Sequence, residues 1–413
     1  MFKTFFMVKI KKLKIRGIKK MSVTQTTDLA PEVQAAYDKR FLLTAKPLMV
    51  AEQFAQKRTL GQGKGKTVRF TRYLPLPIRT TPLTETADGG ITNKALKTQE
   101  IEATVAQYGD VVEISEMASK TAIDVGVKEK VNIVAQQAGE TMNALINEVI
   151  GKGFLRTRAD GDSTYQYEGA VTTEGTKTTL ICSGLTQADD FWNGAYVTFT
   201  DPQDKNYGVT VKVTDFVAST DTATVETLPF KTVVGAKFRI VSGYGTLATD
   251  VISAAVIKKA VRDLKRNKAL PMVDGKYIAI VDPDISYDFM NDTEWKSVKQ
   301  YQDAKDIYQG ELGEWCGVRF IEATSIYRED AGTTAATLGA ASDTGNGHIV
   351  SVLGKEAFGV VELEGGEKKI FVKNGNELGQ ALELTGTVGW KVAFTAKVLN
   401  ACFGVNIICG ATA

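Results

Sequence analysis

The chain has 413 residues, 43% of them hydrophobic and 24% charged, which allows two or three domains and excludes a globally disordered protein. No run of about 18 apolar residues occurs, so no transmembrane helix is expected. The formal net charge is +2, but residues 1–20 hold eight basic residues and no acid. In the rest of the chain 48 acidic residues outnumber 42 basic ones. This balance argues against a dedicated nucleic-acid-binding protein.

Residues 1–20 form a basic extension. Its longest apolar run, residues 5–8, is shorter than the roughly 7–15 apolar residues that a secretory signal needs. Two interpretations remain: a disordered basic arm that contacts phosphates, or a leader that precedes a true start at Met21. Because the phenylalanine and isoleucine content suits a solvated arm poorly, we favour the start at Met21.

Residues 28–59 predict helical pieces. Asp28 can cap the first piece, Pro31 lies in its first turn, and Pro47 interrupts the pattern. A glycine-rich stretch at 61–67 follows, and we interpret it as a flexible hinge before the next element.

An extended hairpin is predicted over residues 61–115. Alternation over 68–73 (VRFTRY) predicts one strand and alternation over 101–114 the returning one, with prolines and an Asp-Gly-Gly at 88–90 marking an irregular tip. A two-stranded hairpin with few apolar residues is marginal in water by itself. We therefore expect it to rest on another domain or another molecule.

The strongest helix signal runs over residues 123–149. Asp124 lies near its start, and Gly151 and Gly153 follow its expected end. About 26 residues at a rise of 1.5 Å give a rod of roughly 39 Å, which fits a structural spine. The apolar stripe at steps of three and four comprises Ile123, Val127, Val131, Val134, Ala138, Met142, Leu145 and Val149.

Residues 155–243 change to short β-branched, alternating segments divided by turn signals, which predicts a small all-β domain inserted as a unit. Thr249 or Asp250 is expected to begin a second helix, whose last turns are rich in lysine and arginine. A buried-type strand (KYIAIVD) then ends at Pro283, and the remainder mixes strands with glycine-rich turns. The fold class is therefore α+β.

No pattern that could carry chemistry forms a complete motif. The glycine run 61–67 misses the phosphate-loop spacing by one residue and precedes a strand rather than a helix. His348, the only histidine, has no acid within four residues, which favours a structural role. Asp282 and Asp284 could bind a cation, but Asp-Pro-Asp is also ordinary turn chemistry. The four cysteines form no CxxC pair. We expect no catalytic residues, no cofactor and no metal.

The order of these elements resembles the Hong Kong 97-type major capsid proteins of tailed bacteriophages. Several stretches are similar to the N-four-like major capsid protein family in particular, over roughly residues 28–150 and 246–409. The insert at 155–243 lies outside the resemblance. The similar stretches are DLAPEVQAAYDKRFL (28–42), FAQKRTLGQGKGKTVRFTRYLPLP (54–77), ATVAQYGDVVEISE (103–116), TAIDVGV (121–127), AGETMNALINEVI (138–150), GELGEWCGVRFIEA (310–323), LGKEAFG (353–359) and GWKVAF (389–394).

The resemblance implies a Hong Kong 97-type capsid fold divided into an arm, an extended loop, a peripheral domain and an axial domain. The expected divisions are 1–21 as a basic extension that is disordered or not translated, 22–60 as the N-terminal arm, 61–115 as the extended loop hairpin, 116–154 as the spine helix and peripheral domain, 155–243 as the inserted all-β domain, and 244–413 as the axial domain with the return strands of the peripheral domain.

The resemblance also implies the function and the partners. The expected function is a major capsid protein that self-assembles, as hexamers and pentamers, into an icosahedral shell around double-stranded DNA. Expected partners are a scaffolding protein, a portal, the packaged DNA without sequence specificity and a decoration protein, with no membrane; the expected location is the virion, assembled in the host cytoplasm. The hairpin offers charges of both signs for contacts between subunits, and the candidates are Arg69, Arg72, Arg79, Glu85 and Asp88.

Two other functions stay open from the sequence. An encapsulin-like compartment has the same fold but holds cargo rather than DNA. A hydrolase with a β accessory module is the enzymatic alternative, weakened by the single histidine. Lys94 and Lys97 lie where some relatives of the family form cross-links, but we interpret them as surface lysines.

Overall fold

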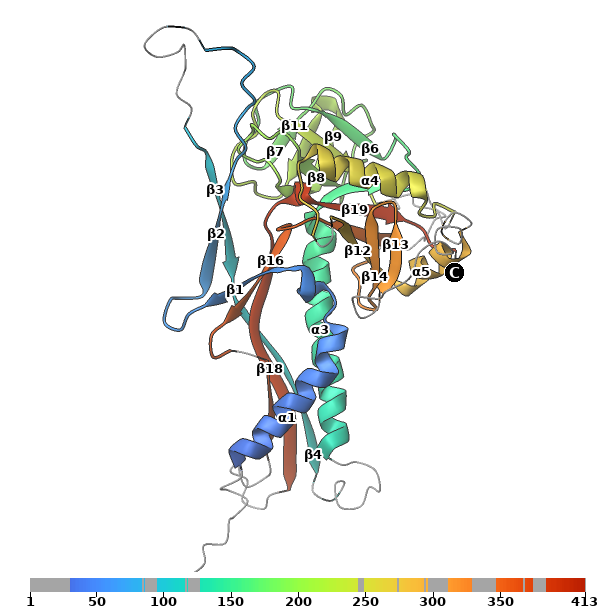
Figure 1. The fold of residues 1–413 in the computed structure, drawn as a ribbon. Helices are drawn as coiled ribbons and strands as arrows, with labels where there is room; N and C mark the ends of the chain where they lie inside the picture. The colour runs from blue at the N-terminus through green and yellow to red at the C-terminus, as the bar shows by residue number, and fades with distance from the viewer. Residues whose placement is uncertain are drawn as a thin grey trace, which may run out of the picture.

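A computed structural model describes residues 30–83, 85, 95–115, 117, 127–243, 249–272, 275–292, 295, 311–328, 347–366, 368–373 and 384–412. These residues form an elongated molecule, in which a helix and a sheet make a shaft, a hairpin projects from one side and two β units lie at one end (Figure 1). The extension at 1–21, Asp28, Asp88 and Lys94 lie outside the described residues. No helix in the described ranges is long and apolar enough to cross a membrane.

The N-terminal arm begins with helix α1 (Ala30–Ala45), which packs against the long helix α3 (Val127–Gly153). The helical pattern was expected to continue to residue 59, but β1 (Gln56–Leu60) is a strand that pairs in parallel with β16 (Phe358–Leu363). Pairing with a distant strand outweighs local propensity here. Short 3-10 helices occur at η1 (Lys46–Leu48), η2 (Ala51–Phe54), η3 (Ala218–Thr220) and η5 (Ala401–Phe403).

The hairpin is shorter than the sequence predicts. Its strands β2 (Thr67–Tyr73) and β3 (Thr98–Thr104) pair antiparallel. The returning stretch breaks at Val105, and β4 (Ala106–Ser115) pairs instead along β18 (Thr385–Val398). Ten residues of the long strand β18 pair with β4. The second half of the predicted return strand therefore belongs to the shaft.

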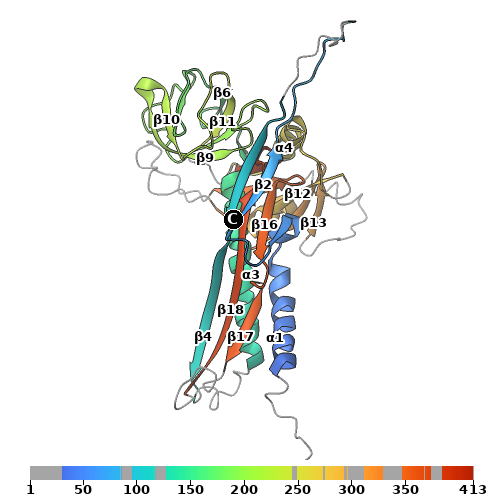
Figure 2. The same cartoon turned by 90° about the vertical axis from the view of Figure 1, so that its left-hand side faces the viewer.

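The shaft sheet is built around β18. One edge of β18 pairs with β17 (Lys369–Lys373) and then β16, and the other edge pairs with β4; Figure 2 shows these strands side by side with α1 and α3. Helix α3 covers the sheet, and its buried stripe packs with Trp390 and Phe394 of β18. The buried apolar side chains of α3 are Val131, Val134, Ala135, Ala138, Met142, Ile146 and Ile150.

Two details of α3 differ from the sequence-based expectation. Toward its end the buried row is Met142, Ile146 and Ile150, whereas Leu145 is only half-buried. Gly151 and Gly153 do not follow the helix but lie in its last turn, where a Cβ atom would collide with Tyr327 and Val398 respectively. Close packing rather than helix termination requires these two glycines.

The inserted unit is a six-stranded antiparallel sheet in the order β6-β11-β8-β9-β10-β7. It has its own core, which includes Trp192, Phe199, Phe216 and Phe238. Its strands are β6 (Gln166–Ala170), β7 (Thr179–Ile181), β8 (Tyr196–Phe199), β9 (Thr210–Val217), β10 (Thr222–Val225) and β11 (Lys237–Val241).

The second unit at this end is a six-stranded mixed sheet in the order β13-β14-β12-β15-β19-β5. Strand β5 therefore joins this sheet, although it starts the range assigned to the insert. Helix α4 (Ala254–Arg266) begins after Ser253 rather than at Thr249 or Asp250, and α5 (Pro283–Asn291) follows β12. The strands are β5 (Leu155–Arg158), β12 (Tyr277–Val281), β13 (Glu311–Trp315), β14 (Val318–Glu322), β15 (His348–Leu353) and β19 (Gly404–Cys409).

Candidate functional site

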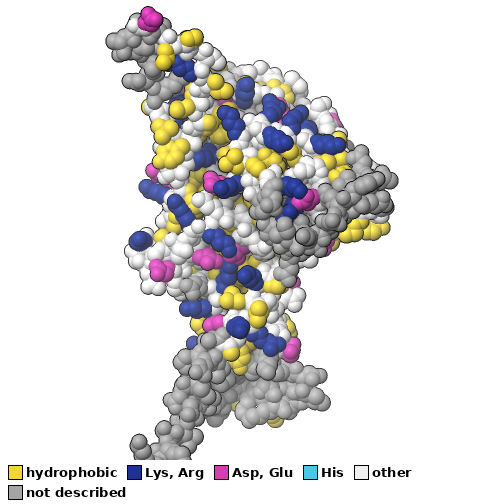
Figure 3. Space-filling model, viewed as in Figure 1, with side chains coloured by type: hydrophobic (Ala, Val, Ile, Leu, Met, Phe, Trp, Pro, Cys, Tyr) yellow, Lys and Arg dark blue, Asp and Glu magenta, His cyan; other side chains and the backbone are white. Residues whose placement is uncertain are grey.

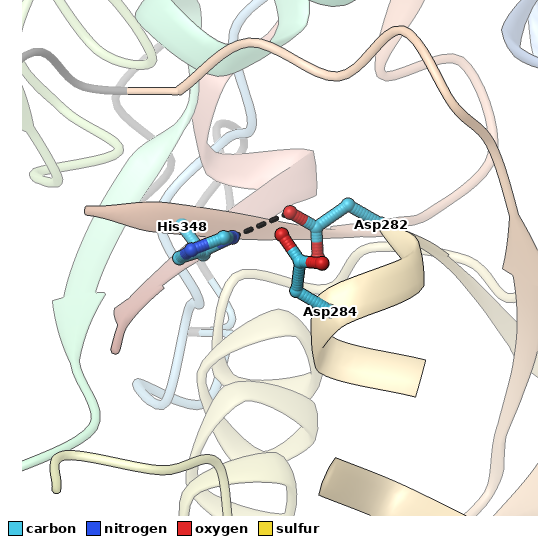
Figure 4. A group of neighbouring side chains, drawn as sticks. All are labelled: Asp282, Asp284 and His348. Atoms are coloured by element: carbon cyan, nitrogen blue, oxygen red, sulfur yellow. Dashed lines mark hydrogen bonds and ion pairs between the residues drawn. The ribbon is translucent and has the colours of Figure 1, made fainter. Parts of the chain in front are cut away.

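The structure brings together the two chemical candidates that the sequence left separate. Asp282 ends β12 and caps α5 by accepting a hydrogen bond of 3.1 Å from the Ile285 amide. Its other carboxylate oxygen, Oδ2, lies 2.5 Å from Nδ1 of His348 at the start of β15, and Asp284 lies beside them (Figure 4). Sequence reasoning missed this contact because 66 residues separate the partners; the signal is that each flanks one of two antiparallel neighbouring strands.

The charges around Asp282, Asp284 and His348 indicate a structural role. We call these three residues the clasp. Asp282, Asp284 and His348 place possible metal ligands within 4.8 Å of one another. Arg328 already neutralises both carboxylates, at 3.3 Å from Asp282 and 2.6 Å from Asp284. Burial acts to raise the pKa of Asp282, but the hydrogen bond from His348 and the charges nearby outweigh it, so the pKa lies below its ordinary value.

A cysteine lies next to the clasp, but its surroundings disfavour the reactive form of its thiol. The Cys409 thiol lies 3.7 Å from the backbone oxygen of His348 and is fully buried. Burial and the carboxylates nearby raise the pKa of this thiol, which disfavours the reactive thiolate. The cluster can therefore join β12, α5 and β15 mechanically, and it lacks an activated nucleophile.

Among the five contact candidates of the hairpin, Arg69 is paired across the two strands. Its guanidinium lies 2.8 Å from Glu102 and 3.6 Å from Glu100 of β3, and all three side chains are exposed. Arg79 and Glu85 lie beyond β2, where the Arg79 Nε donates a hydrogen bond of 3.2 Å to the Thr81 carbonyl. The four candidates that the structure describes, Arg69, Arg72, Arg79 and Glu85, thus do not form one cluster.

Arg72 differs from the other candidates because it is held inside the subunit. It donates a hydrogen bond of 3.0 Å to the Leu399 carbonyl and also contacts the Tyr207 carbonyl and the Gln99 side chain. Burial lowers the pKa of the guanidinium, and its carbon lies 5.5 Å from the centre of the Tyr207 ring. Arg72 therefore connects the hairpin to the insert and to the end of β18, a relation with no local sequence signal.

The segment beyond β2 exposes apolar side chains. Leu74 is buried against Tyr207 and Cys402, whereas the described residues that follow it, 75–83 and 85, are all exposed where their burial is given. Figure 3 shows hydrophobic side chains along the projecting hairpin. Clustered apolar exposure of this kind marks a surface that another molecule covers. The exposed fractions are 62% for Tyr73, 55% for Leu76, 80% for Ile78, 66% for Leu83 and 57% for Leu96.

A groove of about 890 Å³ lies between the hairpin, the shaft and the insert. Leu145 and Val149 of α3 form part of one wall, and the ion pair between Glu148 and Lys152, at 2.6 Å, lies beside them. This groove explains why Leu145 and Val149 belong to the apolar stripe in the sequence and yet are only half-buried.

Comparisons with known proteins agree with this architecture. Residues 245–401 match a family model described as phage capsid protein. Similar solved structures include the capsid of Ralstonia phage GP4, at 15% identity over 87% of each chain with a TM-score of 0.52. The capsid of cyanophage Pam1 is 16% identical, over 88% of this chain and 93% of that chain, with a TM-score of 0.49. A search of curated proteins finds no match.

The chain has the Hong Kong 97-type fold of phage capsid proteins, and residues 245–401 match the phage capsid family. The α+β class expected from the sequence is confirmed. The family match and the fold support the role of a major capsid protein, a structural component of the phage shell.

Proposed function

We propose that this subunit assembles as hexamers and pentamers into an icosahedral shell that encloses the double-stranded DNA of a tailed phage. The observation that carries the proposal is the projecting segment after β2, whose apolar residues, such as Ile78, have no core of their own to enter. In an assembly of obligate interfaces, which exceed about 2,000 Å² in total, a neighbouring subunit covers that segment.

In this proposal the hairpin of one subunit lies over the next. Arg79, Glu85 and Asp88 follow β2 in the sequence and contact the neighbour. Arg69 and Arg72 act indirectly, because their charges are engaged inside the subunit and set the shape and direction of the hairpin. Each exposed ion pair between subunits contributes only about 0–1 kcal/mol, so burial of apolar side chains drives association and the charges set the register.

The remaining parts have separate roles in the same proposal. The arm at 22–60 reaches another subunit, and the insert at 155–243 stands on the outer face of the shell as the docking place of a decoration protein. A scaffolding protein and a portal act during assembly in the host cytoplasm. The subunit carries out no catalysis and needs no cofactor.

The proposal is tested by electron microscopy and sedimentation of the purified protein, alone and with a scaffold. We expect closed shells or capsomers from the wild type. Deletion of residues 75–97, or the milder I78S/L83S variant, should leave a folded subunit that sediments as a small species. The matched control is V233S/V234S, since Val233 and Val234 are exposed by 47% and 58% on the insert. Normal shells from the deletion variant would refute the proposed role of the hairpin.

A further inference from the structure

Helix α4 presents two very different sides. One side packs into the core of the mixed sheet through Val256, Ile257, Ala260 and Leu264. The other side faces solvent, and apart from Ala255 its exposed side chains are basic. These exposed residues are Lys258, Arg262, Lys265, Arg266 and, just after the helix, Lys268, with Lys259 partly exposed beside them.

Among the described residues, most of the positive charge on this side has no ion-pair partner, and Arg262 is the exception. The only acid between residues 258 and 268 is Asp263, which is buried and shared between Arg239, at 2.8 Å, and Arg262, at 2.9 Å. Within the part of the chain that the structure describes, the lysines of this stretch and Arg266 form no ion pair. We call these six cations, Lys258, Lys259, Arg262, Lys265, Arg266 and Lys268, the α4 basic face.

The helix itself does not account for so many cations. The helix dipole favours positive charge only in the last turn, which covers Lys265 and Arg266. Lys258 lies two turns earlier, and like charges at spacings of four residues, such as Lys258 with Arg262 and Arg262 with Arg266, destabilise a helix. An anion outside the subunit would relieve this repulsion.

Helix α4 contacts the insert through the Asp263–Arg239 pair. In Figure 2, α1 and α4 lie toward one side of the molecule, and the inserted sheet extends toward the other. In Figure 3 lysine and arginine side chains gather over α4. From Lys258 to Arg266 the helix rises about 12 Å, and the same length of a DNA duplex carries about seven phosphate charges.

We propose that the α4 basic face binds the phosphate backbone of double-stranded DNA without sequence specificity, and that this side of the subunit faces the packaged genome. The inference rests on the proposed function, because it assigns a surface to the DNA enclosed by the shell. Point charges along a rigid helix suit evenly spaced phosphates, and phosphate contacts carry no sequence information. The excess of acidic over basic residues after residue 20 does not oppose this, because binding depends on the local field.

The test measures binding of a mixed-sequence duplex of about 30 base pairs to unassembled full-length subunits by fluorescence anisotropy, at about 50 and 200 mM salt. The variant K258Q/K265Q/R266Q removes three charges from the α4 basic face. The control K177Q/K205Q/K212Q removes three exposed charges from the insert. Both chains keep residues 1–20, so any contribution of that extension cancels.

We expect the α4 variant to bind at least about tenfold more weakly at the lower salt, with a salt slope shallower by about 2–3, because each lost phosphate contact removes about 0.9 from the slope. The control should stay within about twofold. Equal losses in both variants would overturn the inference by showing a diffuse effect, as would an unchanged α4 variant. Binding of polyglutamate, but not of DNA, by the basic face would indicate an acidic protein partner and would also overturn it.

Two further measurements separate the possible failures. The single variant K258E, a change at one exposed position, keeps the test valid if the triple variant melts abnormally. Shell formation by each variant is followed by electron microscopy. Normal shells with unchanged DNA affinity contradict only the α4 inference, whereas a wild type that forms no shell contradicts the proposed function.

Discussion

The guanidinium of Arg72 donates a hydrogen bond of 3.0 Å to the backbone carbonyl of Leu399, which lies 327 residues further along the chain. The same group contacts the Tyr207 carbonyl, so the hairpin, the end of β18 and the insert meet at one half-buried charge. Gly208, at φ +66°, makes room for it, because a Cβ atom there would collide with Asn400 and Arg72. The direction of the hairpin is thus fixed by the subunit itself before any neighbour binds.

Replacing Arg72 with methionine should lower the free energy of unfolding by about 2–4 kcal/mol. The variant leaves buried carbonyl groups of Leu399 and Tyr207 without their donor, and each unsatisfied group costs about 1–3 kcal/mol. Urea unfolding measures the change, and limited proteolysis reports whether the hairpin becomes mobile. The matched control is Arg69→Met, whose exposed ion pairs contribute at most about 1 kcal/mol. Equal losses in the two variants would contradict a special role for Arg72.

Ile146→Asp should prevent folding, whereas Glu148→Ala should cost at most about 1 kcal/mol. Ile146 is 1% exposed between α3 and the sheet, and burying an unpaired carboxylate there costs several kcal/mol of a total near 5–15. Glu148 loses only its exposed pair with Lys152. Leu145→Asp is expected to be intermediate, because its side chain can reach the groove. Thermal melting checks the order; native-like melting of Ile146→Asp would show that α3 faces another way.

The clasp at Asp282 should make stability depend on pH below about pH 4. The pKa of Asp282 is lower in the folded state than its unfolded value near 3.9, so its contribution is present above that value and is lost as pH falls through the folded pKa. In Asp282→Asn, which can still cap α5, this part of the acid dependence should disappear. Urea midpoints between about pH 2.5 and 6 measure it. Identical pH profiles for the two proteins would argue against the clasp.

Gly153→Ala should destabilise the protein although alanine is the better helix former. Propensity alone predicts a gain of about 1 kcal/mol. The added methyl group instead meets Val398 of β18, and overpacking of a core costs about 1–3 kcal/mol. The second change Val398→Ala should restore part of the loss, and a double-mutant cycle measures the coupling. A more stable Gly153→Ala single variant would mean that the glycine serves as a helix terminus after all.

Residues 159–243 should fold when expressed alone. Their core of large buried side chains, including Trp192 and Phe216, lies within the insert, and β5 is left out because it pairs in the other sheet. Well-dispersed amide resonances in an NMR spectrum are expected, with a cooperative melt. A collapsed spectrum would show that contacts outside this range, such as the pair between Arg239 and Asp263 of α4, are essential to the fold.

Local patterns in the sequence predict the elements that depend on local periodicity. The stripe of α3 from Val131 to Met142, the short strands of the insert and the buried strand β12 appear where alternation or helical spacing predicts them. Elements that depend on a distant partner do not: β1 becomes a strand only because β16 is available, and the return strand divides at Val105 because β18 attracts its second half. The Asp282–His348 contact and the burial of Arg72 are missed for the same reason.

The insert begins and ends at one place, since Gln166 of β6 pairs with Val241 of β11 on neighbouring strands. A unit attached by two adjacent strand ends can be exchanged without altering the distance that the rest of the chain must span. A capsid lineage could therefore vary the chemistry that it shows to its surroundings while its assembly contacts stay constant. The same attachment makes this position a suitable site for genetic fusion. A foreign domain with adjacent termini would be displayed there once per subunit.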